Sequence, residues 1–501
     1  MIQHILTVFS QSLFAPIKAI KRQYIPLLMI YFAYGAQAIT GVALTFWEKE
    51  FLSLGAEELV AVSVWVWLPF TIKMVFGQLV DVVSLFGSKR KAWVFLGACF
   101  MALGYLMLYG MSVDSPLVTW LGSQFNMYLA AQLIMILGFV IQDVTADAMT
   151  TEVVDRNQPD EAVKAELAMV QVLGRLSLMI ASAVTGGIGG YLASTLEYDN
   201  VFLIALFVPV ISILGALFVS LNTAEQSNQT KLSPIIFGGG VAFAVFSAVM
   251  GFSQFAYSQE TTFLVSFTLI CWMLSVLLKQ QPSTVIKSII LTFIALFVFR
   301  ATPSVGPGFN WWAIDTLGFD QAFFGVLRQV GGFAALIVLW FTADFIANKP
   351  IRAVLILLIV LGTVLSMPDV MLFYSVHDLI GVDPRTIALL DTMAESPLVH
   401  MSMIPMLALI AYYAPEGQRA TWFAVSASLM NLATTAGSLL TKYLNKMFVV
   451  TREVKDADGL LLTAANYSEL GWLLWLSVGM SFVIPLLVVL ALLKEPQKLE
   501  N

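Results

Sequence analysis

Charged residues are scarce in this chain of 501 residues. Asp, Glu, Lys and Arg together make up 12% of it, whereas apolar residues make up 59%. Soluble domains carry roughly 25% charged residues. A water-exposed surface as poor in charge as this one would leave apolar patches far larger than soluble monomers tolerate. The composition therefore excludes a soluble globular, disordered or fibrous protein and indicates a chain embedded in a membrane.

Residues that build metal and catalytic centres are also few. The two cysteines, Cys99 and Cys271, lie in apolar runs, and the three histidines are scattered, which excludes a disulfide framework and a metal cluster of Cys or His. The sequence has no phosphate-binding Gly-Lys-Ser/Thr loop, no His-Glu-x-x-His and no nucleophile elbow. We therefore expect neither an enzyme nor an ATP-driven pump, no cofactor and, without a basic patch, no nucleic-acid partner.

Long apolar runs recur along the whole chain. A helix needs about 20 apolar residues to cross a bilayer, and runs of this length are about twice as long as the strands of a membrane β-barrel. The sequence therefore predicts an all-α integral membrane protein with about fourteen spans. Their predicted ranges are 25–47, 58–80, 92–111, 123–150, 165–192, 200–221, 234–255, 261–279, 285–306, 322–346, 350–374, 384–413, 420–441 and 469–493.

The positions of the basic residues predict the orientation of the spans. Of the 26 Lys and Arg, 16 lie on the side of the N-terminus, six on the other side and four inside predicted spans, and basic loops stay in the cytoplasm. Both termini are therefore predicted to be cytoplasmic, with the outer loop 442–468 as a basic exception. Residues 1–23 are predicted to form a basic amphipathic lead-in on the membrane surface. The short loops favour a bacterial inner membrane.

An internal repeat divides the chain into two halves. Gly55 and Gly318, Asp81 and Asp344, and Lys89 and Arg352 are three matched pairs with the same separation of 263 positions. Two parallel six-span halves with a substrate site between them are the arrangement of major facilitator transporters. We therefore predict a major facilitator fold plus an inserted helix pair. The predicted segments are the lead-in 1–23, the N-terminal half 24–222, the linker with two extra spans 223–283, the C-terminal half 284–494 and a cytoplasmic tail 495–501.

Residues 77–91, GQLVDVVSLFGSKRK, resemble the signature loop that major facilitator transporters carry between their second and third spans. The resemblance implies that this loop controls switching between inward and outward states rather than contacting substrate. A loop that only sets topology is the alternative. The predicted gating residues are Gly77, Asp81, Lys89, Arg90 and Lys91.

Three stretches are similar to one family in particular. Residues 69–91 combine Pro69-Phe70 with the signature loop, residues 300–328 carry Ala-Thr-Pro, Leu-Gly-Phe and Phe-Gly-x-x-Arg, and residues 404–432 hold a spaced set of Pro, Gly, Ala-Thr and Asn-Leu. Together they resemble the folate–biopterin transporter family of the major facilitator superfamily. That resemblance implies a secondary active transporter of folate, biopterin or a related pteridine, working by alternating access and coupled to protons.

Two other functions remain open at this stage. Muropeptide permeases share Gln142-Asp143 and Asp147 in the fourth span and also have fourteen spans, so a transporter of peptidoglycan fragments is the nearest alternative. A membrane sensor that kept the fold and lost transport is the second alternative.

Four charged residues are predicted to meet at mid-membrane. Asp143 and Asp147 are one helical turn apart in the fourth span. Arg175 in the fifth span and Lys73 in the second lie at comparable depth, so Asp143 is predicted to pair with Arg175. Charges inside a membrane are costly and mark function by default. The cluster is either a structural neutralisation of charge or a relay for protons and substrate.

Arg300 in the ninth span is predicted to bind substrate. The 263-residue offset places it opposite Gln37 in the first span, so the two are expected to face each other across the central cavity. A guanidinium offers a fixed set of donors to a carboxylate, which suits the glutamate of a folate. Pairing with Asp315 or Asp391 is the structural alternative.

Further candidates lie in the tenth and twelfth spans and beside the ninth. Asp391 and Glu395 are one turn apart, and either carboxylate suits the adjacent N–H groups of a pterin, as does Asp143. Asn310 is a candidate substrate contact, while its neighbours Trp311 and Trp312 are expected in an interfacial aromatic belt. The remaining expectations are structural, namely a packing role for His400 and a pair between Arg328 and Asp320.

Overall fold

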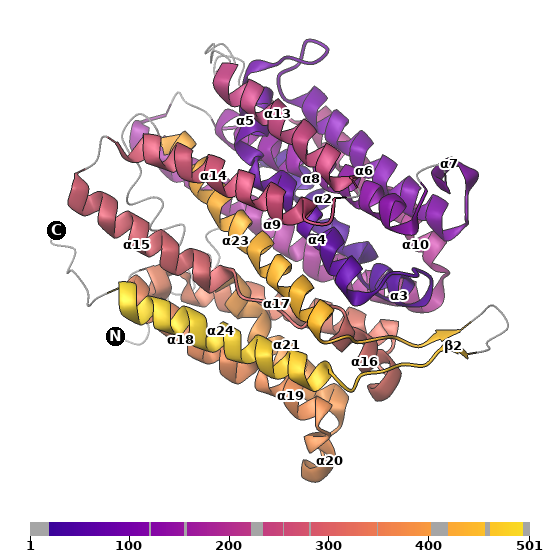
Figure 1. Cartoon of the computed structure of the whole chain (residues 1–501). Helices are drawn as coiled ribbons and strands as arrows, with labels where there is room; N and C mark the ends of the chain where they lie inside the picture. The colour runs from indigo at the N-terminus through magenta and orange to yellow at the C-terminus, as the bar shows by residue number, and fades with distance from the viewer. Residues whose placement is uncertain are drawn as a thin grey trace, which may run out of the picture.

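The structure, a computed structural model, is an almost entirely helical bundle (Figure 1). It describes residues 20–119, 122–154, 158–221, 234–253, 255–279, 282–347, 349–401, 419–455 and 461–493. The predicted tail 495–501 and nearly all of the predicted lead-in 1–23 lie outside these ranges.

The elements fall into three consecutive sets. The first set, the N-terminal helix group, contains η1 (Arg22–Tyr24), α2 (Ile25–Ala36), η2 (Gln37–Thr40), α3 (Gly41–Glu50), α4 (Ala56–Thr71), α5 (Lys73–Val82), α6 (Lys91–Ser112), α7 (Pro116–Thr119), α8 (Gln124–Glu152), α9 (Asp160–Thr195), α10 (Tyr198–Ile204) and α11 (Phe207–Phe218). The inserted pair is α13 (Pro234–Gly251) and α14 (Ser258–Leu278). The C-terminal helix group contains α15 (Ser283–Arg300), α16 (Gly308–Leu317), α17 (Gln321–Ala347), α18 (Ile351–Leu365), α19 (Met367–Phe373), α20 (Val376–Ile380), α21 (Pro384–Met401), α23 (Arg419–Met447) and α24 (Leu470–Leu492), with strands β1 (Val454–Lys455) and β2 (Leu461–Thr463).

The helices support the predicted class but not the predicted number of spans. Within the described ranges ten helices are long and apolar enough to cross a membrane, or eleven if the bent pair α4 and α5 forms one span. Each predicted range overlaps a helix, yet the count of fourteen stays a prediction. The outer loop also contains the short antiparallel strands β1 and β2, which an all-α expectation did not include.

Two breaks in the first spans bring polar residues to the interior. The first span narrows to a 3-10 turn at Gln37–Thr40 between α2 and α3. The second bends by 47° between α4 and α5. Pro69 lies one turn before this bend and has no N–H to continue the helical bonding, and the N–H of Ile72 bonds instead to the carbonyl of Pro69 at 3.3 Å. Lys73 begins the next helix at this bend.

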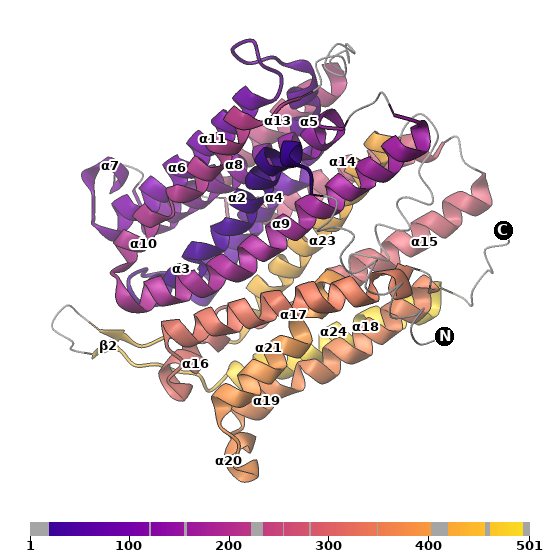
Figure 2. The ribbon, with the colours of Figure 1, turned by 180° about the vertical axis from the view of Figure 1, so that it is seen from behind.

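The two helix groups meet at one end of the bundle. We call this end, where α3 finishes and β1 and β2 lie, the hairpin end, and the opposite end, with residues 83–90, the basic-loop end. α9 and α17 lie together near the hairpin end and diverge toward the basic-loop end (Figure 2). A Cβ on Gly190 would lie 2.2 Å from the Cα of Gly325, so these glycines allow the two backbones to touch.

Polar contacts across the hairpin end reinforce this closure. Lys49 of α3 pairs with Asp315 of α16 at 2.6 Å. The guanidinium of Arg452 donates from the loop before β1 to the carbonyls of Glu48 and Leu54 at 2.8 and 3.0 Å. Residues of the C-terminal group therefore hold the loop that joins the first two spans.

The inserted pair bridges both groups. Gln259 of α14 donates to the carbonyl of Ala61 in α4 at 3.0 Å. Lys442 of α23 donates to Gln259 at 2.9 Å and to Glu260 at 2.7 Å, and Tyr443 donates to Glu260 at 2.7 Å. These contacts tie α14 to the N-terminal group through one neutral bond and to the C-terminal group through an ion pair.

Candidate functional site

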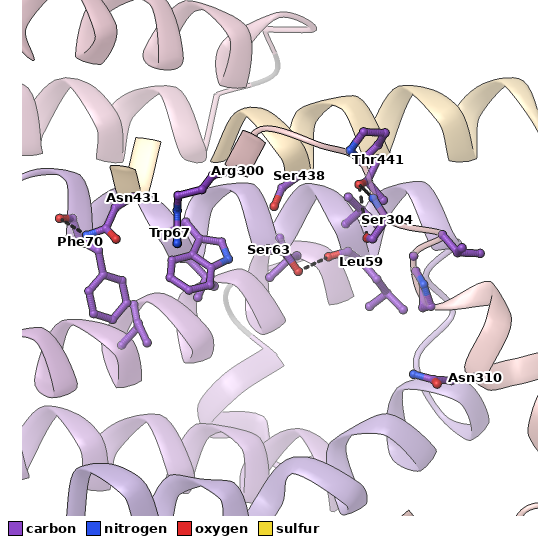
Figure 3. A pocket seen from close by; sticks show the side chains of 18 of the residues that line it. Leu59, Ser63, Trp67, Phe70, Arg300, Ser304, Asn310, Asn431, Ser438 and Thr441 are labelled. Carbon is purple, nitrogen blue, oxygen red and sulfur yellow. Dashed lines mark hydrogen bonds between the residues drawn. The ribbon is translucent and has the colours of Figure 1, made fainter. Parts of the chain in front are cut away.

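A cavity of about 1320 Å³ that contains several charged and polar side chains lies between the two helix groups. Its walls come from α2, η2, α3, α4, α5, α8 and α9 on one side and from α15, α16, α19, α21, α23 and α24 on the other. The contacts at the hairpin end close it there, and the helix groups diverge toward the basic-loop end. Figure 3 shows side chains of α4 facing Arg300 and side chains of α23 across the space. The cavity is large enough for a drug-sized ligand.

The four charged residues predicted at mid-membrane do meet. Lys73 forms an ion pair with Asp143 and lies 3.6 Å from Asp147. Arg175 lies 3.9 Å from Asp143 and 3.6 Å from Asp147. The predicted contact between Asp143 and Arg175 is therefore confirmed. Tyr31 adds a hydrogen bond to Asp147 at 2.7 Å.

The charges of this cluster balance, but its arginine remains accessible. Asp143 is 4% exposed, whereas the side chain of Arg175 is 53% exposed. Lys73, Asp143 and Arg175 all line the cavity. An anion that enters the cavity can thus reach the guanidinium of Arg175 without first unfolding the cluster.

Arg300 and Gln37 both line the same cavity, as predicted from the repeat. The guanidinium of Arg300 donates to the hydroxyl of Thr434 at 3.3 Å, and its Nε is buried without a hydrogen-bond partner. Of the described carboxylates, neither Asp315 nor Asp391 pairs with it. Arg300 therefore keeps donors for a ligand.

An aromatic surface lies beside Arg300. Trp67 is 36% exposed although it lies in α4, and its ring contacts that of Phe70 with centroids 5.6 Å apart. Figure 3 shows Arg300 directed toward Trp67, with Asn431 close to Phe70. Asn431 donates to the carbonyl of Phe70 at 3.2 Å. A flat ring that binds here can stack on the aromatic side chains and form hydrogen bonds with the polar groups beside them.

Three carboxylates gather on the C-terminal wall. Glu395 of α21 and Asp369 of α19 line the cavity, and Asp391 lies one turn before Glu395. Asp391 is 8% exposed, and its Oδ1 has no hydrogen-bond partner. Of the two carboxylates predicted in α21, only Glu395 is part of the cavity wall, and Asp391 lies behind it.

Asn310 lines the cavity, but the expectation for its two tryptophan neighbours was wrong. Trp311 and Trp312 are buried rather than placed in an interfacial belt. The guanidinium of Arg452 covers the ring of Trp311 at 5.2 Å, and Trp312 packs against Phe373 with centroids 5.4 Å apart. The ring of Trp311 is buried because Arg452, which precedes β1, lies over it, and the ring of Trp312 is buried against α19; the span pattern predicted neither contact.

The predicted pair between Arg328 and Asp320 was also wrong. Arg328 donates across the groups to the carbonyl of Gly41 at 3.2 Å. Asp320 pairs with Arg385 at 2.8 Å instead. Both departures follow from the close approach of α17 to the N-terminal group. The side chain of His400 lies outside the described residues.

The predicted gating loop forms a compact charged turn at the basic-loop end. Arg90 is buried, pairs with Asp81 at 2.8 Å and Glu152 at 2.7 Å, and donates to the carbonyl of Val80 at 2.7 Å. Lys91 donates to the carbonyl of Leu217 at 3.2 Å, and Lys89, directly before Arg90, is half-buried. A Cβ on Gly77 would make only ordinary contact, with Val144 at 3.7 Å, so close packing does not explain this glycine.

Sequence reasoning missed three parts of the cavity. Trp67 was hidden in an apolar run. Asp369 stands in a short helix after a break and has no motif around it. Glu48, whose carboxylate accepts from Tyr128, lies at the end of the first span. A carboxylate inside a predicted span was the available signal for Asp369.

The fold and the cavity together define a class. Solved structures of POT family transporters have the same arrangement. One in complex with 5-aminolevulinic acid has a TM-score of 0.67 at 14% identity, covering 94% of this chain and 96% of its own. Another, in complex with a thioalcohol-conjugated peptide, has a TM-score of 0.65 at 14% identity, covering 94% and 98%. The chain is an integral membrane protein with the major facilitator fold.

The sequence places it in a family. The pattern of the BT1 family matches residues 35–500, so the chain belongs to the BT1 family. It is 27% identical to a folate-biopterin transporter of Synechocystis over 89% of this chain and 80% of that protein. It is 22% identical to folate transporter 2 of Plasmodium falciparum, over 81% and 76% of the two chains. A probable folate-biopterin transporter 4 of Arabidopsis thaliana is 21% identical, over 82% and 86%.

Proposed function

We propose that this protein moves folate, biopterin or a related pteridine across the membrane by alternating access. The observation that carries the proposal is Arg300, which keeps unused donors beside the exposed ring of Trp67 in a cavity between two helix groups. The names of the relatives in Synechocystis, Plasmodium and Arabidopsis support the same substrate class. A planar heterocycle joined to an anionic tail matches this pairing of ring and cation.

Each part of such a substrate has a counterpart in the wall. The heterocycle stacks on Trp67, where Asn431 and Gln37 offer further polar groups. Its adjacent N–H donors face Glu395, which binds both in a bidentate manner. Asn310 lies toward the hairpin end of the same cavity. Asp391 lies behind this wall and influences substrate binding only through Glu395.

The anionic tail binds Arg300 of the C-terminal wall and the two cations of the N-terminal wall. Arg175 is accessible, and Lys73 lies at the helix bend beside it. Because these cations neutralise Asp143 and Asp147 in the empty cavity, a substrate carboxylate competes with the two aspartates for them. The four residues thus form a relay that senses whether the cavity is occupied, and we propose that transport is coupled to protons.

The gating loop and the basic residues support an orientation for the cycle. We propose that the basic-loop end, with Lys89, Arg90 and Lys91, faces the cytoplasm of a bacterial inner membrane and that both termini lie there. The closed hairpin end then makes this the inward-facing state. Rocking of residues 24–222 against residues 284–494, with residues 223–283 as the inserted pair, gives the outward-facing state.

Replacement of Arg300 tests the proposal. A hydrogen bond to a charged group is worth about 1.5–3 kcal/mol, so Arg300→Ala is expected to weaken binding of folic acid about tenfold to a hundredfold. The measurement is ligand-dependent thermal stability of the purified protein in detergent. A ligand at one hundred times its dissociation constant stabilises the wild type by about 2.7 kcal/mol.

The matched control is Arg385→Ala, which removes an arginine that is paired with Asp320 away from the cavity wall. It is expected to bind folic acid like the wild type. Stabilisation of the wild type by anhydro-muropeptides and not by folic acid or biopterin would contradict the proposal and favour a permease for peptidoglycan fragments. Stabilisation by none of them would favour a sensor.

A further inference from the structure

The C-terminal wall holds a group of carboxylates for which the described part of the chain offers no counter-charge. Asp391 and Glu395 lie one turn apart on α21 and so on one face of the helix. α19, which carries Asp369, packs against α21, and each of the three carboxylates lies close enough to another to repel it when both are ionised. This group differs from the cluster on the opposite wall, where two cations balance two anions.

None of the charged groups described on the surrounding helices neutralises the three carboxylates. On α17, Arg328 donates to Gly41 and Thr45 of the N-terminal group. On α18, Arg352 stands in the first turn at the basic-loop end, and on α21 Arg385 pairs with Asp320. His377 of the adjoining α20 contacts Asp378, and Arg300 across the cavity bonds to Thr434.

Asp391 is the member for which ionisation costs most. It is more than nine-tenths buried, and its Oδ1 has no hydrogen-bond partner among the residues that the structure describes. An ionised carboxylate that is buried without a partner loses its hydration and gains nothing in return, and two neighbouring carboxylates cannot both ionise cheaply. The described residues also contain no set of ligands that could hold a metal ion here. A proton is the remaining cation that fits.

We propose that Asp391 is a proton-binding site and carries the proton that couples transport, with Glu395 linking it to the substrate. This rests on the proposed function. When the N–H donors of a pteridine bind Glu395, they favour its ionised form. The negative charge of Glu395, one turn away, then strengthens the hold of Asp391 on its proton.

The coupling is reciprocal. If substrate strengthens the binding of the proton, the proton strengthens the binding of substrate by the same factor. Asp369 faces both carboxylates from α19 and adds to the repulsion. Asp143 and Asp147 sense the substrate on the other wall, where their charges are already balanced by Lys73 and Arg175.

The test separates coupling from binding. Purified wild type, Asp391→Asn and Asp147→Asn are placed in liposomes, and uptake of folic acid is measured twice, once driven by a proton gradient and once as exchange against internal folic acid without a gradient. Asp391→Asn is expected to lose gradient-driven accumulation at least tenfold and to keep exchange within about threefold. Asp320→Asn, a carboxylate paired at the surface, is the control and is expected to keep both.

A second measurement needs no substrate. The infrared absorption of a protonated carboxyl group differs from that of a carboxylate, and the wild type at neutral pH is expected to show such a band that Asp391→Asn lacks. Asp369→Asn, which removes one source of repulsion, is expected to weaken this band. If the wild type shows the band but exchanges no folic acid, the proton site stands and the proposed substrate is wrong.

Either measurement can overturn the inference. In the transport assay, the inference fails if Asp391→Asn accumulates folic acid under the gradient as the wild type does. It also fails if Asp147→Asn loses this accumulation and Asp391→Asn does not. In the infrared measurement, it fails if the spectrum of the wild type has no protonated carboxyl band that depends on Asp391.

Discussion

Asp143→Asn is expected to abolish transport of folic acid and to destabilise the protein. Asp143 is almost fully buried between Lys73 and Arg175, and its removal leaves two cations against Asp147 alone. Loss of one partner from a buried ion pair costs about 3–5 kcal/mol. The measurements are thermal unfolding in detergent and uptake into liposomes.

The double variant Asp143→Asn with Lys73→Met distinguishes the two interpretations of this cluster. It removes one charge of each sign and leaves Arg175 paired with Asp147, so most of the stability is expected to return while transport remains absent. Recovery of both stability and transport would show that the charges serve packing only. Asp320→Asn is the control, because a partly exposed pair contributes at most about 1 kcal/mol.

Gly190→Leu is expected to hold the hairpin end open and to reduce transport at least tenfold. A Cβ at this position would lie 2.2 Å from the backbone of Gly325, so the larger side chain separates α9 from α17. The measurement is labelling of a cysteine introduced at Asn310, in a background without Cys99 and Cys271, by a membrane-impermeant maleimide added at the hairpin end. The wild-type cavity is expected to be protected and the variant labelled.

Gly479→Leu is the matched control. An added Cβ at Gly479 of α24 meets no atom within 4 Å, so this variant is expected to transport normally and to remain protected from the label. If Gly190→Leu also stays protected and active, the glycine contact does not form the seal at the hairpin end.

The membrane class and the charge cluster could be predicted because both depend on short stretches of sequence rather than on contacts between distant segments. Apolar runs mark spans, and Asp143, Arg175 and Lys73 have depths that follow from their distances to the helix ends. The repeat also placed Arg300 and Gln37 on one cavity.

Contacts between distant segments could not be predicted in this way. The burial of Trp311 depends on Arg452, more than a hundred residues later. Arg328 bonds to Gly41 instead of Asp320, because glycines on the facing sides of α9 and α17 let these two helices approach closely. Trp67 looks like any aromatic residue of an apolar run, and only the helix arrangement shows that its ring faces a cavity.

The bridge made by α14 has a mechanical consequence. Opening the hairpin end separates α4 from α23, and α14 cannot remain bonded to both. A neutral hydrogen bond contributes about 0.5–1.5 kcal/mol and one to a charged group about 1.5–3 kcal/mol, so the bond from Gln259 to Ala61 breaks before the contacts of Lys442 with Gln259 and Glu260. The end of α14 that carries Gln259 and Glu260 is then expected to stay with the C-terminal group, while α13 keeps its packing against α5 of the N-terminal group. A lipid or protein that grips this pair from the bilayer would slow the carrier without entering the substrate's path.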